Sequence, residues 1–120
     1  EPVALGTNHA AVESGAVDIL AHPGLLALED ARLAALHHCY IEITTRRGHC
    51  LTNGHVAQVC ALAGAGMVVN TDAHGPSDFV SLDFAQQVAA GAGLSEKAVF
   101  AATVTNPQEL VSRFLAGRQR

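Results

Sequence analysis

Short apolar segments rich in β-branched residues recur along the chain, and each is followed by a break and then by a helical pattern. The segments are VDILAH (17–22), YIEITT (40–45) and MVVNTDAH (67–74). Their spacing, roughly 25 to 30 residues, is typical of strand–helix units. Strands joined through helical crossovers lie parallel, because the crossover returns the chain in the same direction. We therefore predict an α/β fold built of parallel βα units.

Between and after these segments, alanine and leucine recur near the 3.6-residue helical period. Polar residues stand where two of the expected helices begin: Thr52 or Asn53 can cap one, and Ser77 or Asp78 the next. The TNP sequence at 105–107 predicts a break in the carboxyl-terminal helical region. The expected helices cover 26–38, 54–66 and 79–93, followed by a pair on either side of that break.

The length and composition predict one globular domain, residues 1–120. Hydrophobic residues make up 49% of the chain, which is enough for a core. The formal net charge of -4 disfavours nucleic acid as a partner, and no apolar run approaches the roughly 20 residues of a membrane span. Three cysteines without CxxC spacing, and no signal-peptide pattern at the start, indicate a reduced cytoplasmic protein.

Polar residues follow each of the three expected strands. His22 ends the first, Arg46 and Arg47 follow the second, and Asp72 and His74 end the third. In parallel α/β folds the reactive residues gather at the carboxyl ends of strands. Residues i and i+2 of a strand share a face, so we expect Asp72 and His74 to point at one object. Imidazole nitrogen and carboxylate oxygen favour a metal ion.

Two further residues lie close to these strand ends and keep open interpretations. His49, in the loop RRGH, would either contact a substrate or form a hydrogen bond within the loop. Glu42 lies inside the second strand and would face either the site or a helix. An arginine fork such as that of Arg46 or Arg47 would suit a phosphoryl group.

Three motifs together, DILAHPG, IEITTRRGH and VVNTDAHGPSDF, resemble the carboxyl-terminal half of the polymerase and histidinol phosphatase family over roughly residues 17 to 80. That resemblance implies part of a distorted seven-stranded β/α barrel. It also implies two or three clustered divalent ions (zinc, manganese or iron) and hydrolysis of a small phosphorylated metabolite. By the same resemblance, His22, Asp72 and His74 would be metal ligands, and Asp72 and His74 would act in catalysis. Arg46, Arg47 and His49 would contact the substrate.

The chain also departs from the family pattern. The HxH motif and the other ligands of the family's first half are not found here. We therefore expect a carboxyl-terminal part that is weakly active alone and is completed by self-association or by an amino-terminal half. Two alternatives stay open: a metal-dependent hydrolase of the amidohydrolase kind, and a non-catalytic accessory module of the sort attached to DNA polymerases.

Overall fold

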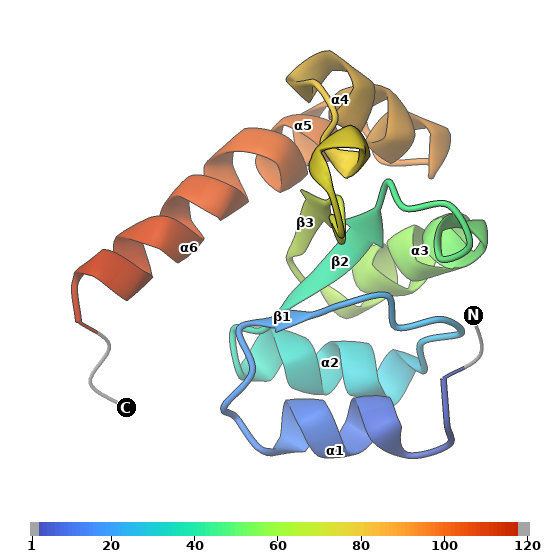
Figure 1. The fold of residues 1–120 in the computed structure, drawn as a ribbon. Helices are drawn as coiled ribbons and strands as arrows, with labels where there is room; N and C mark the ends of the chain where they lie inside the picture. The colour runs from blue at the N-terminus through green and yellow to red at the C-terminus, as the bar shows by residue number, and fades with distance from the viewer. Residues whose placement is uncertain (1–2, 118–120) are drawn as a thin grey trace.

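The central strand of the protein, β2 (Tyr40–Thr44), is buried along its whole length and pairs with a parallel strand on each side. The computed structural model describes residues 3–117. β2 lies between β1 (Ile19–Leu20) and β3 (Met67–Asn70), in the order β1-β2-β3 (Figure 1). The helices are α1 (Thr7–Glu13), α2 (Leu28–Leu36), α3 (Asn53–Ala63), α4 (Leu82–Gly91), α5 (Glu96–Phe100) and α6 (Asn106–Leu115).

The parallel strand–helix alternation matches the prediction, but the expected part of a seven-stranded barrel is wrong. The described residues form an open sheet of three short strands. β1 pairs with β2 at only two positions, Ile19 with Tyr40 and Leu20 with Ile41. Barrel closure requires more strands, each tilted and staggered against the next. The molecule is therefore a small α/β domain with an open sheet.

Two of the strands are shorter than their apolar segments predict. β1 covers Ile19–Leu20 of the expected 17–22, and β3 ends at Asn70 rather than at His74. The backbone leaves the extended region soon after each strand, since His22 has φ 32° and Asp72 has φ 46°. These left-handed conformations are uncommon for residues with a side chain. The polar residues after both strands therefore lie on turns.

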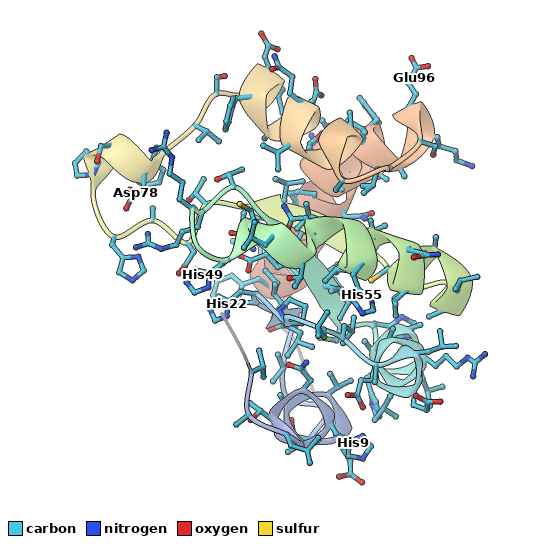
Figure 2. The ribbon with its side chains drawn as sticks, turned by 90° about the vertical axis from the view of Figure 1, so that its right-hand side faces the viewer. His9, His22, His49, His55, Asp78 and Glu96 are labelled. Carbon is cyan, nitrogen blue, oxygen red and sulfur yellow. The ribbon has the colours of Figure 1, made fainter. Side chains whose placement is uncertain are left out.

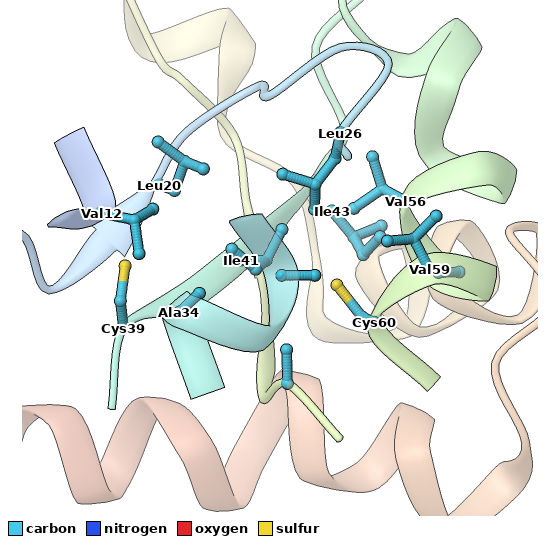
Figure 3. Close-up of a cluster of buried hydrophobic side chains, with 13 residues drawn as sticks. Val12, Leu20, Leu26, Ala34, Cys39, Ile41, Ile43, Val56, Val59 and Cys60 are labelled. Carbon is cyan, nitrogen blue, oxygen red and sulfur yellow. The ribbon is translucent and has the colours of Figure 1, made fainter. Parts of the chain in front are cut away.

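The hydrophobic core lies between one face of the sheet and the first three helices (Figure 3). Ile41 and Ile43 of β2 are fully buried there against α2 and α3, whereas Tyr40 and Glu42 point to the other face. Tyr40 donates a hydrogen bond from its hydroxyl to Glu109 of α6 over 2.9 Å. Residue parity along β2 thus separates an apolar core from a polar second face.

Residues 96–115 form one continuous helical stretch instead of a broken pair. α5 passes through a π-helical segment, Ala101–Thr105, directly into α6 (Figure 1). Pro107, which has no N–H to donate, follows the π-helical segment at the second position of α6. The TNP sequence therefore marks a change of helical geometry, and the predicted break is wrong.

Helix starts agree with the sequence in part. Ser81, not Ser77 or Asp78, caps α4 by accepting the Phe84 N–H over 3.2 Å. α3 ends at Ala63 with Gly64 as its cap, three residues before the predicted end at Gly66. Thr52 precedes α3 without a capping bond from its side chain. None of the helices described is long and apolar enough to cross a membrane.

Asn53 uses its side chain to hold the end of β2. Its Oδ1 accepts the Thr44 N–H over 3.1 Å and its Nδ2 donates to the Thr44 carbonyl over 2.8 Å. The residue is 8% exposed, so both bonds are shielded from water. A single amide therefore joins the first turn of α3 to the last residue of the central strand.

We predict that Asn53→Ala lowers the free energy of unfolding by about 2 to 4 kcal/mol, because it leaves two buried backbone groups of Thr44 unpaired. Urea denaturation followed by circular dichroism measures this loss. Gln58→Ala, at an exposed position of α3, is the matched control and should change stability little. Equal effects of the two substitutions would contradict the role given to Asn53.

α1 lies against the loop that follows β1. Asn8 donates to the Pro23 carbonyl over 2.8 Å, and His9 Nδ1 lies 2.8 Å from Asp30 Oδ1 at the start of α2. Glu13, one turn along α1, lies 3.8 Å from the same imidazole. The hydrogen bond to Asp30 and the two carboxylates raise the pKa of His9. Protonated His9 thus ties α1 to α2.

The resulting pH dependence has a definite sign. The His9 pKa is higher in the folded protein than its ordinary 6.5, so its stabilisation is complete below that value and is lost as pH rises through the folded pKa. We predict that His9→Asn flattens this decline in urea midpoints measured from pH 5.5 to 8.5. Asp30→Asn should flatten it equally, and the double variant no further. An unchanged pH profile in His9→Asn would refute the link.

Candidate functional site

The chain segments that follow β2 and β3 emerge side by side. Thr44 pairs with Asn70 at the last position of the two strands, and the Thr45 N–H donates to the Asn70 carbonyl over 2.9 Å. Residues 45–49 and 71–78 therefore begin at the same edge of the sheet. The segment after β1 joins them, because the His22 N–H donates to the carboxylate of Glu42. This carboxyl edge is the candidate site.

Four of the sequence-predicted site residues lie close together there. The imidazoles of His22 and His49 stack with ring centroids 4.8 Å apart. Figure 2 shows these two residues next to each other. His49 Nε2 lies 3.9 Å from Asp72 Oδ2, and the same carboxylate oxygen lies 3.5 Å from Arg46 Nε. His22, His49, Asp72 and Arg46 thus form a continuous cluster built from all three strand ends. We call it the edge cluster.

His74 lies apart from the ring stack. Its side chain is exposed, and its Nδ1 lies 2.7 Å from the Asp72 carbonyl. That contact requires the proton on Nδ1, which leaves Nε2 as the acceptor nitrogen of the neutral ring. We expected Asp72 and His74 to share one face of a strand. That expectation is wrong, because β3 ends at Asn70 and the backbone at Asp72 is in the left-handed region.

Asp78 is a residue of the site whose role sequence reasoning missed. Its Oδ2 accepts the N–H groups of His74 at 2.8 Å and Gly75 at 3.1 Å, and lies 3.3 Å from Arg46 Nη1. The hydrogen bond from His74 and the nearby Arg46 guanidinium lower the pKa of Asp78. The signal in the sequence was its position three residues after Gly75, from which a carboxylate can accept the N–H of the residue that begins the turn.

The two arginines have different surroundings. Arg46 also donates from Nη1 to the Asp72 carbonyl over 2.9 Å, so the β3 loop wraps its guanidinium. Arg47 is exposed. Both line an open hollow of about 470 Å³ between the ends of β2 and β3. Its other lining residues are Thr45, Thr71, Ser77, Asp78, Val80 and Phe84.

Glu42 lies beneath the edge cluster on the second face of β2. It is 2% exposed, and burial raises the pKa of its carboxyl, an effect opposed by the hydrogen bond from His22. Its contact with His22 answers the question left open by the sequence, because the side chain faces the site. Burial raises the pKa of the Cys60 thiol to about 12, so this cysteine is not a reactive thiolate near neutral pH.

The donor types suit a divalent metal, but their arrangement supplies only part of a site. Within residues 3–117, no three side chains of histidine, cysteine, aspartate or glutamate are grouped so as to hold a metal ion. His49 and Asp72 approach each other, while His22 is stacked and His74 faces solvent. A zinc site needs three or four protein ligands. The described residues therefore offer an incomplete ligand set.

Comparison with known proteins finds a relative of this chain. The chain is 42% identical over 113 residues to an uncharacterized protein of Methanocaldococcus jannaschii. The match covers 94% of this chain and 52% of the relative, so the chain spans about half of that protein's length. No protein-family profile and no solved structure gives a significant match.

We predict that Asp78→Ala loosens the 72–78 loop, because the amides of His74 and Gly75 lose their acceptor. Amide hydrogen exchange followed by NMR should show faster exchange at both positions, with little change in β2. Asp83→Ala, an exposed acidic position on α4, is the control and should leave these amides unaffected. Unchanged exchange in Asp78→Ala would mean that the loop is held by other contacts.

Proposed function

We propose that the carboxyl edge of this sheet belongs to a metal-dependent phosphoesterase that hydrolyses a small phosphomonoester. The observation that carries the proposal is the position of two arginines in one hollow, directly beside the edge cluster. Phosphate esters are anionic, and hydrolysis requires both charge neutralisation and a group that handles protons. Here the two arginines would neutralise charge, and the edge cluster would handle protons. The motif resemblance of residues 17 to 80 is consistent with the same activity.

Phosphate binding would be shared unequally by the arginines. Asp72 and Asp78 hold Arg46 in a fixed orientation, at 3.5 and 3.3 Å, so its positive charge is preorganised but partly neutralised. Arg47 is exposed at the same hollow and can turn its fork toward the phosphoryl oxygens. We therefore assign direct phosphate contact to Arg47 and a positioning role to Arg46.

Proton handling would fall to the edge cluster. His49 Nε2 faces the Asp72 carboxylate at 3.9 Å. The His49 imidazole can donate a proton to the leaving oxygen and can then be reprotonated by water.

The metal requirement is part of the proposal. His22, Asp72 and His74 would hold divalent ions such as zinc, manganese or iron, together with ligands beyond the described set. A divalent ion bound there would supply a more acidic water and a positive charge beside the ester. A cytoplasmic location, with a small phosphorylated metabolite as substrate, completes the proposed function.

We predict that Arg47→Ala lowers kcat/KM for small phosphomonoesters by about 10- to 150-fold, as expected from losing a charged hydrogen bond worth about 1.5 to 3 kcal/mol. Release of inorganic phosphate is the assay, run with added Mn²⁺ or Zn²⁺ and with chelator. Isothermal titration with inorganic phosphate provides a readout independent of turnover. Arg47→Lys should recover only part of the loss, because lysine lacks the fork.

Arg32→Ala, at an exposed position on α2, is the matched control for the charge change. It should leave hydrolysis and phosphate binding unaltered. Equal phosphate affinity in the wild type and in Arg47→Ala would remove Arg47 from the site. Absence of phosphatase activity with every added metal would count against the proposed function itself.

A further inference from the structure

One oxygen of Asp78 contacts both the backbone of the β3 loop and an arginine of the hollow. Oδ2 accepts the N–H groups of His74 and Gly75 over 2.8 and 3.1 Å, and it lies 3.3 Å from Arg46 Nη1. The two backbone hydrogen bonds require an acceptor oxygen, whereas the attraction to the guanidinium depends on negative charge. A substitution can therefore separate the loop contacts of Asp78 from its charge.

Asp78 also places a negative charge in the lining of the hollow. The charged side chains that line it, among the residues that the structure describes, are Arg46, Arg47 and Asp78. Two positive charges and one negative charge leave one net positive charge. A phosphomonoester carries about 1.5 to 2 negative charges at neutral pH. The carboxylate of Asp78 therefore cancels half of the positive charge that the arginines offer to such an anion.

Arg46 has contacts that would hold it in place without the charge of Asp78. Its Nη1 donates to the Asp72 carbonyl over 2.9 Å, and its Nε lies 3.5 Å from Asp72 Oδ2. The distance of 3.3 Å to Asp78 is longer than the roughly 2.7 to 2.9 Å of a strong charged hydrogen bond. Removal of the Asp78 charge would therefore change the electrostatic potential of the hollow more than the position of Arg46.

We propose that Asp78 sets the anion affinity of the hollow: its oxygen orders the β3 loop, and its charge keeps the arginines from binding phosphate tightly. The proposal rests on the proposed function and adds a control on affinity at the same site. Phosphate and the Asp78 carboxylate compete for the same positive charges, so the affinity is lower than two arginines alone would give. Moderate affinity suits a phosphatase, because inorganic phosphate is also its product and must leave.

Isothermal titration of the 120-residue chain with inorganic phosphate compares the wild type with Asp78→Asn. The asparagine oxygen can still accept the two loop N–H groups, so this variant loses the charge and keeps the acceptor. In about 50 mM NaCl we expect Asp78→Asn to bind phosphate about 3- to 10-fold more tightly. In about 500 mM NaCl the difference should fall below about twofold, because the Asp78 side chain is 35% exposed and salt screens its charge. A change in loop structure alone would give no such salt dependence.

Asp83→Asn is the matched control, since it removes the same charge from an exposed position on α4 that does not line the hollow. It should leave phosphate affinity within about twofold of the wild type, because salt screens a distant exposed charge. Circular dichroism of each variant checks the fold. Asp78→Ser, which is neutral and keeps an acceptor oxygen, carries the test if the asparagine variant unfolds.

Phosphate binding by the wild type, with equal or weaker binding by Asp78→Asn, overturns this proposal and leaves the proposed function standing. A gain that persists unchanged at high salt, or an equal gain in Asp83→Asn, overturns it as well, since the effect would then not come from a charge in the hollow. Absence of phosphate binding by the wild type and by every variant overturns both this proposal and the proposed function.

Discussion

The two hydrogen bonds between the Asn53 amide and the backbone of Thr44 are the constraint on which the rest of the site depends. They fix where the central strand ends, and they fix the start of α3 relative to that end. The arginines of the candidate site follow this point in the chain, and the end of β3 lies beside it. Arg46 and Arg47 follow Thr44 after one residue, and β3 is in register with Thr44 through Asn70. A buried amide with both of its groups paired is a rigid connection, because neither partner can exchange with water.

The β3 loop completes the site by binding back onto the β2 loop. The guanidinium of Arg46 contacts this loop at three groups: the Asp72 carbonyl, the Asp72 carboxylate and the Asp78 carboxylate. The left-handed backbone at Asp72 makes this return possible. Such conformations persist only where surrounding contacts compensate for them, and they occur often at functional sites. The contacts that Arg46 makes with this loop therefore compensate for the strained backbone at Asp72 and order part of the lining of the hollow.

The second face of β2 gives the site a buried carboxylate. Parity along the strand sends Ile41 and Ile43 into the core and Glu42 to the opposite side, where it meets the His22 backbone. This explains why the first strand can be only two residues long and still deliver His22 to the cluster. The side chain of Glu42 supplies the acceptor that a continuing ladder with β2 would otherwise have supplied.

Sequence reasoning recovered the elements whose cause is local. The apolar segments predicted three parallel strands separated by helices, and the structure confirms this. Polar residues were predicted to end the strands, and the structure places His22, Asp72 and His74 a few residues beyond them. Errors arose where tertiary contacts compete with local preference. The Asn53 amide binds the backbone of Thr44 instead of capping α3. The Asp78 carboxylate binds the His74 N–H instead of capping α4.

The sequence by itself determined the alternation of strand and helix, the parallel sheet and the gathering of histidine, aspartate and arginine at its carboxyl edge, because these follow from periodicity and from the direction of the chain. Only the tertiary structure decided that the sheet stays open with three strands, that Asp72 and His74 lie on a turn, and that Phe84 shares a hollow with the arginines. Strand closure, left-handed backbone and contacts between distant loops depend on residues far apart in the chain. No local pattern encodes such contacts.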